Sequence, residues 1–232
     1  MRNLSNRAQF LFAAGAAFGT GLMSAQAGRA AASSGGDQPT PDAAVARLVE
    51  GNRRYMTDTG VNCNRNYNRR LETAAGQMPF AIVLSCADSR VPAEMVFDQR
   101  VGDLFMVRVA GNIVQPAGLG SIEYAIEHFR SPVLMVLGHE SCGAVTATLE
   151  VLKSGQRPPG HIGVLTDAIA PAVRDVAKQP GDVVDKAVHA NVAYVAQELG
   201  AQSEIIARAA SAHKLRIVKA YYALANGQVT IF

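Results

Sequence analysis

Two stretches of the chain decide its fold: FAIVLSCADSR at residues 80–90 and VLMVLGHESC at residues 133–142. Each opens with a short apolar run, at 80–84 and at 133–137, and becomes polar immediately afterwards. Apolar runs of this length, rich in branched side chains and polar at both ends, are typical of buried strands in a parallel sheet. The sequence therefore predicts two buried parallel strands that each end in a polar tip.

The polar tips contain four side chains of metal-ligand type: Cys86, Asp88, His139 and Cys142. Because ligand-binding residues of open α/β sheets lie beyond the carboxyl ends of the strands, we expect these side chains to meet at one edge. Two thiols, an imidazole and a carboxylate form a complete tetrahedral set for Zn²⁺. Arg90 can hold the Asp88 carboxylate in a bidentate pair, and a ligand held in that way can be exchanged for water.

Other interpretations of these residues stay open. Taken singly, each is more often an ordinary buried thiol, a turn residue or a polar strand end. For the four together, a purely structural zinc site is the stronger alternative, and the Arg90–Asp88 pair argues only weakly against it. A dithiol redox protein that uses Cys86 and Cys142 is disfavoured, because the two are not in a Cys-x-x-Cys pair.

The motifs CADSRVP at 86–92 and GHESCGA at 138–144 resemble the two signature motifs of the β-class carbonic anhydrases. The resemblance covers essentially all of the chain after residue 41, and it continues through LVEGN (48–52), VRVAGN (107–112), SIEYA (121–125), AVHANV (187–192), LRIVKAY (215–221) and GQV (227–229). It implies an α/β fold, with a mainly parallel β-sheet flanked by helices and an N-terminal helical arm that embraces a second subunit. A homodimer or a dimer of dimers is therefore expected.

The resemblance also implies an activity, which is the reversible hydration of carbon dioxide to bicarbonate and a proton, with zinc hydroxide as the nucleophile. One Zn²⁺ per chain is expected on Cys86, His139 and Cys142. Water takes the fourth position in the active form, and Asp88 takes it in an inactive form known for some members. In the active form Asp88, held by Arg90, accepts the hydrogen bond from the zinc hydroxide. A carbon disulfide or carbonyl sulfide hydrolase on the same fold, and a non-catalytic zinc-binding protein, are the alternatives.

Further site residues follow from the same resemblance. Gln77 matches the substrate-binding glutamine, and Phe105 and Tyr124 match apolar walls of the pocket. Gly143 is a candidate because of its position, since it follows the last ligand and can bring its backbone amide close to the substrate. Without the resemblance, Gln77 would be interpreted as a solvated turn residue, and Phe105 and Tyr124 as ordinary core residues. Gly143 would be interpreted as a glycine required for packing in the first turn of a helix. His128 matches a position proposed for proton transfer in some members. Members regulated by a bicarbonate site use a tryptophan there, and this chain has none.

The amino terminus predicts export. Residues 1–27 combine a basic start, an apolar middle and the cleavage site AQA, so we interpret them as a signal peptide of a periplasmic protein. The apolar run is too short for a convincing membrane anchor; a cytoplasmic protein with an apolar tail is the alternative. Residues 28–40, rich in Gly, Ala and Ser, predict a disordered linker, and residues 41–232 form the catalytic domain.

The net charge and the remaining cysteine and histidine residues give little further information about function. The 22 basic residues include two in the signal peptide, which leaves 20 against 19 acidic ones and no basic stripe for nucleic acid. Cys63 is left over in the polar loop 62–70, either as an unpaired thiol or in an intermolecular disulfide. His189 and His213 are interpreted as structural, and His161 as a cap or hydrogen-bond partner at a helix start.

The regular elements alternate in the manner of an α/β fold. Besides the two strands above, the pattern predicts a strand at 104–109 and closing strands at 215–222 and 229–232 around an Asn226–Gly227 turn. Helices are predicted at 41–56, 118–129, 142–153, 162–177, 182–198 and 202–213, with a break at Gly200.

Overall fold

The computed structural model describes residues 37–61 and 66–232, which lie in one compact unit. The predicted signal peptide, most of the predicted linker and Cys63 lie outside the described residues. The helices and strands, in chain order, are α1 (Pro41–Met56), α2 (Tyr67–Ala74), β1 (Ala81–Ser85), α3 (Ala93–Val96), β2 (Leu104–Arg108), the 3-10 turn η1 (Ala110–Asn112), α4 (Pro116–Phe129), β3 (Val133–His139), α5 (Gly143–Ser154), α6 (Ile162–Val173), the 3-10 turn η2 (Val176–Lys178), α7 (Val183–Gln202), α8 (Glu204–Ser211), β4 (Arg216–Tyr222) and β5 (Val229–Ile231).

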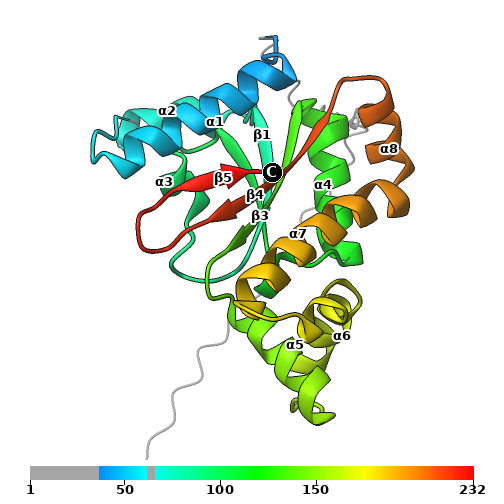
Figure 1. The fold of residues 1–232 in the computed structure, drawn as a ribbon. Coiled ribbons are helices and arrows are strands. Elements are labelled where there is room, and N and C mark those ends of the chain that lie inside the picture. Colours follow the sequence, from blue (N-terminus) through cyan, green and yellow to red (C-terminus); the bar gives the residue numbers. More distant parts are fainter. Residues whose placement is uncertain (1–36, 62–65) are drawn as a thin grey trace, which may run out of the picture. The chain divides into compact units, whose positions relative to one another are not determined.

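The centre of the fold is a five-stranded sheet of order β2-β1-β3-β4-β5. The first four strands are parallel, and β5 returns antiparallel to β4 through the predicted Asn226–Gly227 turn, where Gly227 has φ +74°. Every residue of β1 and β3 is buried, as expected for central strands that are covered on both faces. The predicted α/β fold with a mainly parallel sheet is thus confirmed (Figure 1).

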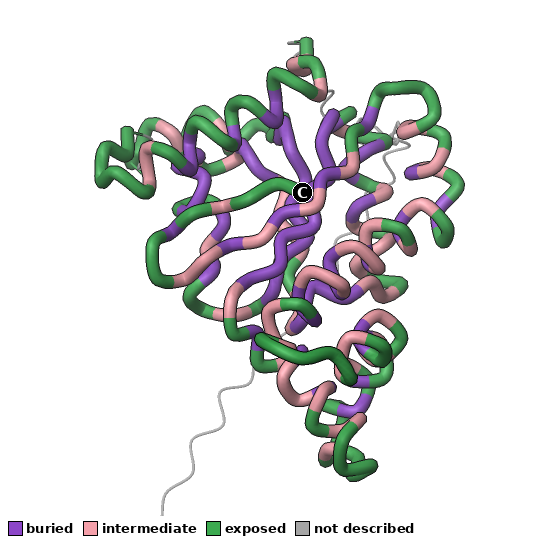
Figure 2. Tube along the Cα trace, in the orientation of Figure 1, coloured by how far each residue is buried: buried purple, intermediate pink, exposed green. Residues whose placement is uncertain are grey.

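Alternation along the strands divides the core between the two faces of the sheet, and the buried strands lie between helices on both sides (Figures 1 and 2). Val83 and Met135 pack in the cluster that contains α1 and α3, whereas Leu84 and Val136 pack in the cluster that contains α4, α7 and α8. A third cluster surrounds the carboxyl end of β1 and joins it to α5, α6 and α7. The helices therefore enclose both faces and one end of the central strand pair.

Local signals explain where several helices begin and end. The Thr40 hydroxyl accepts from the Ala43 N–H at the start of α1, and Pro41 occupies the first helical position. Helix α5 ends at Gly155, whose φ of +70° is the left-handed conformation that favours glycine at this position. Gln38, at the end of the predicted linker, donates to the carbonyl oxygens of Pro79 and Phe129.

Three expectations about the helices were wrong. Residues 67–70 of the predicted polar loop begin α2, which has no buried residue and therefore no apolar periodicity to reveal it. Helix α7 continues through Gly200 to Gln202, because burial of the neighbouring Leu199 outweighs the glycine penalty of about 1 kcal/mol. The helix expected at 162–177 ends at Val173 and is followed by the separate turn η2.

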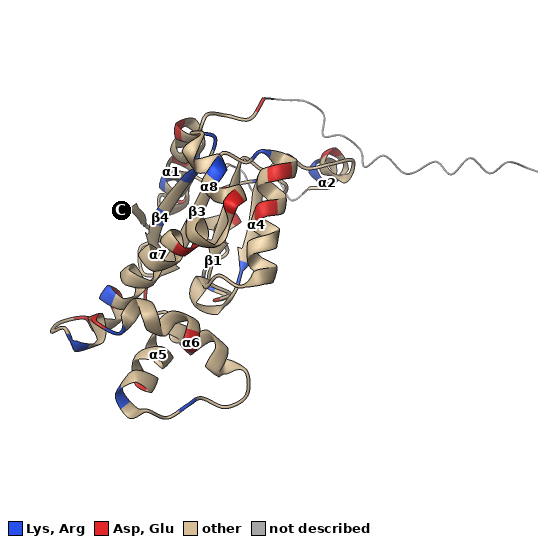
Figure 3. Cartoon of the chain, turned by 90° about the vertical axis from the view of Figure 1, so that its right-hand side faces the viewer, with Lys and Arg blue, Asp and Glu red and all other residues tan. Residues whose placement is uncertain are grey.

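The surface carries both signs of charge. In the view onto α4, α7 and α8, the positions of both acidic and basic residues are visible along the chain (Figure 3). Within the described residues, no helix is both long enough and apolar enough to cross a membrane.

Candidate metal centre

Three of the predicted metal-ligand residues meet at the carboxyl ends of β1 and β3. Cys86 directly follows β1, His139 is the last residue of β3, and Cys142 caps the start of α5. Their ligand atoms lie within 4.8 Å of one another, and all three residues are buried. On a tetrahedral zinc ion such atoms are about 3.6–3.8 Å apart. Two adjacent parallel strands thus bring the two motifs together as the sequence predicted.

The imidazole of His139 is oriented by its neighbour. Its Nδ1 lies 2.8 Å from the carbonyl oxygen of Glu140, and because a carbonyl can only accept, the proton must be on Nδ1. Nε2 is then an acceptor, and it is completely buried without a hydrogen-bond partner. A buried acceptor of this kind, beside two thiols, fits a metal ion whose ligand is the neutral imidazole.

Glu140 is in turn held by the end of β4. Its N–H donates to the carbonyl oxygen of Tyr222 over 2.9 Å, and its carboxylate accepts from the N–H of Leu224 over 2.8 Å. The carbonyl that orients His139 is therefore fixed by the neighbouring strand.

The two thiols differ in their tendency to ionise. The hydrogen bond between them lowers the pKa of Cys86 against the opposing effect of burial, and it raises the pKa of Cys142 together with burial. The N–H of Gly111 also donates to Cys86 Sγ, over 3.3 Å. Burial lowers the pKa of His139, but the close approach and negative charge of the neighbouring Cys86 sulfur outweigh that effect, so the pKa is raised overall. The centre thus favours an anion on Cys86, which is the form that binds metal.

Asp88 and Arg90 form the predicted bidentate pair. Arg90 Nε and Nη2 donate to the two carboxylate oxygens of Asp88 over 2.9 and 2.8 Å, and the Arg90 N–H adds a third bond of 2.9 Å. The Arg90 side chain therefore holds the pKa of Asp88 well below its usual range. Asp88 Oδ2 lies 3.9 Å from His139 Nε2, so the carboxylate borders the centre, while both of its oxygens are engaged by Arg90.

Arg108 is a structural residue of the site that the sequence analysis missed. From the end of β2 its guanidinium donates to the carbonyl oxygens of Cys86 and Asp88, over 3.0 and 2.6 Å. These bonds fix the backbone of the loop that holds a thiol and the carboxylate. A charged residue at the end of an otherwise apolar strand was the available signal.

The predicted substrate-contacting residues are not all near this centre. Gly143 is the first residue of α5, next to Cys142, and the space where its side chain would be is open. Gln77 is exposed and precedes β1, so it lies at the amino end of that strand. Phe105 pairs with Ile82, four residues before Cys86, which corresponds to about 13 Å along the strand. Within one chain, Gln77 and Phe105 are thus remote from the ligands.

Tyr124 belongs with Phe105 rather than with the metal ligands. The centroids of their rings are 6.5 Å apart, and Tyr124 stacks on His128 at 4.0 Å. The side chain of Tyr124 is 48% exposed. This aromatic cluster forms an accessible apolar surface on α4 and β2, and its contact with substrate stays a prediction, as does proton transfer by His128.

The other histidines have ordinary surroundings. His189 stacks on Tyr221 with ring centroids 4.4 Å apart and pairs with Asp185. His161 occupies the position before α6, but its side chain makes no capping hydrogen bond, so that part of the expectation was wrong.

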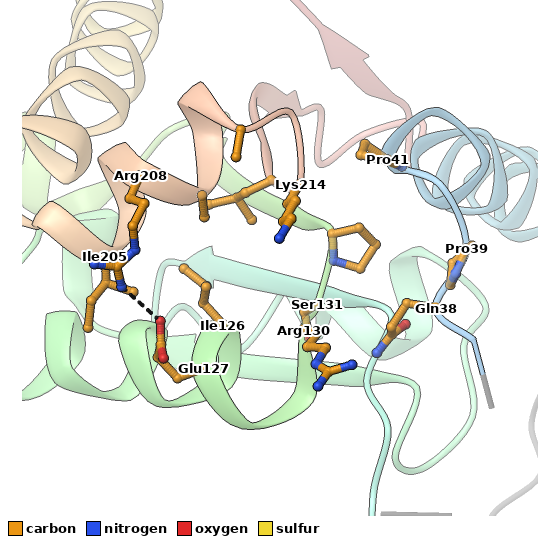
Figure 4. Close-up of a pocket in the computed structure, with 14 residues that line it drawn as sticks. Gln38, Pro39, Pro41, Ile126, Glu127, Arg130, Ser131, Ile205, Arg208 and Lys214 are labelled. Atoms are coloured by element: carbon orange, nitrogen blue, oxygen red, sulfur yellow. Dashed lines mark hydrogen bonds and ion pairs between the residues drawn. The ribbon is translucent and has the colours of Figure 1, made fainter. Parts of the chain in front are cut away.

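A cavity of about 830 Å³ lies at the other end of the sheet (Figure 4). It is bordered by Gln38, by the residues that precede β3 and β4, and by α8, from which Arg208 pairs with Glu127. The seven residues of β3 separate this end from His139 by about 20 Å. The cavity is therefore distinct from the candidate metal centre.

Comparisons with known proteins agree on one family. The family model described as carbonic anhydrase matches residues 81–229. Carbonic anhydrase 2 of Mycobacterium tuberculosis is 39% identical over 195 residues, which cover 82% of this chain and 92% of that protein. A carbonic anhydrase of Mycolicibacterium smegmatis is 38% identical over 191 residues, which cover 82% of this chain and 93% of that protein.

Solved structures support the same fold. The β-carbonic anhydrase of Coccomyxa, solved in complex with acetazolamide, is 27% identical and has a TM-score of 0.64, with 81% of this chain and 86% of that chain covered. A β-carbonic anhydrase of Aspergillus fumigatus is 22% identical, with a TM-score of 0.64 and coverage of 82% and 89%. A β-carbonic anhydrase of Sordaria macrospora that is described as tetrameric is 21% identical and has a TM-score of 0.63, with 81% of this chain and 96% of that chain covered.

Proposed function

Since this chain belongs to the β-carbonic anhydrase family and catalyses the reversible hydration of carbon dioxide, we propose that it does so with one Zn²⁺ held by Cys86, His139 and Cys142. The observation that carries this proposal is the buried Nε2 of His139, which has no hydrogen-bond partner and lies beside two thiols. Bound Zn²⁺ supplies a Lewis acid that makes hydroxide available near neutral pH. The chain's own residues hold the ligands in place and orient the reactants.

Asp88 is proposed to orient the nucleophile. Its low pKa keeps it ionised at neutral pH, so the carboxylate can accept a hydrogen bond but cannot donate one. Its position 3.9 Å from His139 Nε2 sets that acceptor beside the metal-binding atoms. Arg90 fixes the carboxylate through both oxygens, and this favours the form in which Asp88 stays off the metal. Ligation by Asp88 in an inactive form requires these bonds to break.

We propose further that the substrate pocket is completed by a second copy of the chain. Gln77, Phe105 and Tyr124 lie toward the amino ends of β1 and β2, so they can contact a substrate only at the centre of a partner. The exposed apolar face of Tyr124 suits burial in such an interface. A homodimer or a dimer of dimers would satisfy this requirement, and a relative described as tetrameric is consistent with it.

Export to the periplasm is proposed from the sequence of residues 1–27 alone. In that compartment the enzyme would let carbon dioxide and bicarbonate equilibrate outside the cytoplasm. Fractionation of cells that express the full chain, with amino-terminal sequencing of the product, tests both the compartment and the cleavage after Ala27.

The catalytic proposal is tested by stopped-flow hydration of carbon dioxide with the zinc-loaded protein at pH values from about 6.5 to 9. Wild type is compared with Asp88→Asn, which keeps the shape but accepts hydrogen bonds less well. We expect about one zinc per chain in both proteins, and a loss of rate on the order of 10²-fold in the variant. Full zinc loading without hydration in the wild type would refute the proposed mechanism.

A further inference from the structure

A hydrogen-bonded connection runs from helix α7 to the sulfur of Cys86. The Asn191 side-chain amide donates to the carbonyl oxygen of Gly111 over 2.8 Å, and the N–H of the same Gly111 donates to Cys86 Sγ over 3.3 Å. Because a carbonyl oxygen only accepts, it is Nδ2 of Asn191 that must face Gly111. A single glycine thus joins Cys86 to a helix residue that lies 80 positions beyond the glycine in sequence.

Asn191 is an unfavourable choice for packing alone. It is 1% exposed, its Oδ1 has no hydrogen-bond partner, and its helix neighbours Val188 and Val192 are buried apolar residues. A buried polar atom without a partner costs about 1–3 kcal/mol. An apolar side chain would avoid this penalty, so the benefit of asparagine at this position lies in its bond to Gly111.

Close packing restricts both the helix that carries Asn191 and the turn that contains Gly111. A Cβ atom on Gly138 of β3 would lie 2.5 Å from Val192 and 2.9 Å from Val188, which shows that α7 lies directly against the strand that ends in His139. Gly111 has φ +72°, and a Cβ atom there would lie 2.6 Å from Ile169 Cδ1. The turn that contains Gly111 is therefore held between α6 and the Asn191 amide, and its N–H has a fixed direction.

We propose that Asn191 is a positioning residue for the metal centre, which holds the Gly111 peptide so that its N–H donates to Cys86 Sγ. A hydrogen bond to a thiolate withdraws electron density from the sulfur and so sets how strongly that sulfur donates to a metal. Partners of this kind typically change metal affinity or activity by about 10–100-fold. The inference rests on the proposed function, because it takes Cys86 as a ligand of Zn²⁺.

The test compares the full-length wild type with Asn191→Leu, which has a similar volume and no donor. Thr148→Val is the matched control, because Thr148 is equally buried and its hydroxyl donates to Ala144 within its own helix. Zinc affinity is measured by competition with a chromogenic chelator. The thiolate-to-metal charge-transfer absorption is recorded after substitution with Co²⁺.

We expect Asn191→Leu to weaken zinc binding by about tenfold or more, because the Gly111 peptide no longer holds Cys86 Sγ in the ligating position and this loss outweighs the stronger donation of the released sulfur. We also expect its charge-transfer bands to move to longer wavelength, because the sulfur lone pairs lose a stabilising donor. Thr148→Val should change neither quantity. If circular dichroism shows that Asn191→Leu does not fold, Asn191→Ser takes its place with the same expectations, since its shorter side chain does not reach Gly111.

Equal zinc affinity and equal spectra in wild type and the Asn191 variant would overturn the positioning role. The same shifts in Thr148→Val would also overturn it, because they would report general loosening of the core. A wild-type chain that binds neither metal would overturn the proposed zinc centre and the inference with it. Stoichiometric zinc with unchanged affinity in the variant would overturn only the role of Asn191.

Discussion

Gly138 allows helix α7 to approach the strand that ends in His139, and Gly138→Ala tests that contact. The new Cβ atom would lie 2.5 Å from Val192 Cγ2 and 2.9 Å from Val188 Cγ1, whereas carbon atoms pack at roughly 3.5–4.0 Å. Both valines are buried and stiff at χ1, so their methyl groups cannot turn aside. The helix or the strand must therefore shift by about 1 Å.

The expected change in stability is the difference of two effects. Overpacking a core typically costs about 1–3 kcal/mol, while alanine is about 0.5–1 kcal/mol better than glycine within a strand. We expect Gly138→Ala to lower the free energy of unfolding by about 1–2 kcal/mol. Val192→Ala removes the closer methyl group. The loss of unfolding free energy in the double variant should therefore be about 1 kcal/mol smaller than the sum of the losses in the two single variants.

Urea denaturation of the metal-free proteins measures these differences, with unchanged m-values as the check that the unfolded states are comparable. Zinc affinity of Gly138→Ala should fall as well, because His139 is the next residue. A Gly138→Ala protein as stable as the wild type would refute the reasoning. So would a double variant whose loss equals the sum of the two single losses, since the clash with Val192 would then be absent.

Three further predictions concern other parts of the chain. Asp103 is buried against the guanidinium groups of Arg47, Arg69 and Arg100, at 2.6, 3.0 and 3.2 Å. Asp103→Asn removes the carboxylate that these three cations share and should lower the free energy of unfolding by about 2–3 kcal/mol in urea titrations. Burial and the hydrogen bond with the Tyr55 hydroxyl raise the pKa of Tyr222. The neutral Tyr222 side chain therefore contributes its full stabilisation below about pH 10, and this stabilisation is lost as the pH rises further. Tyr222→Phe should reduce the decline of the unfolding free energy between about pH 9 and 11. Zinc present at 100 times its dissociation constant should stabilise the fold by about 2.7 kcal/mol. A chelator should remove this stabilisation together with the hydration activity. An unchanged melting temperature after chelation would contradict a zinc site within the folded core.

The parts of the site that were predictable from sequence are those encoded locally. Cys86 follows one recognisable buried strand and His139 ends another, and the rule that parallel strands end at one edge was enough to bring them together. The Arg90–Asp88 pair spans two residues and was likewise visible in the sequence. Arg108 and Asn191 were not, because they reach the loop 86–90 and Gly111 across 20 and 80 residues. The charged end of an otherwise apolar strand marks Arg108 as unusual, but no local pattern encodes which distant groups these side chains contact.

The helices show the same limit. The start of α1 was predictable because Thr40 and Pro41 are local capping signals. Helix α2 was missed because its attachment is polar and distant: Arg69 donates to the carbonyl oxygen of Val101 and pairs with Asp103. The break expected at Gly200 failed because tertiary packing of Leu199 prevails over local propensity. The signal peptide, the periplasmic location and the role of Cys63 stay predictions.

The attachment of Glu140 to the end of β4 has a consequence for biosynthesis. All three proposed metal ligands have been synthesised once Cys142 is made, about 80 residues before Tyr222 and Leu224. The carbonyl that orients the His139 imidazole is nevertheless fixed by those two late residues. A nascent chain that stops short of β4 therefore contains every proposed ligand but lacks the contacts that orient one of them. Completion of the metal centre is in this way linked to completion of the chain.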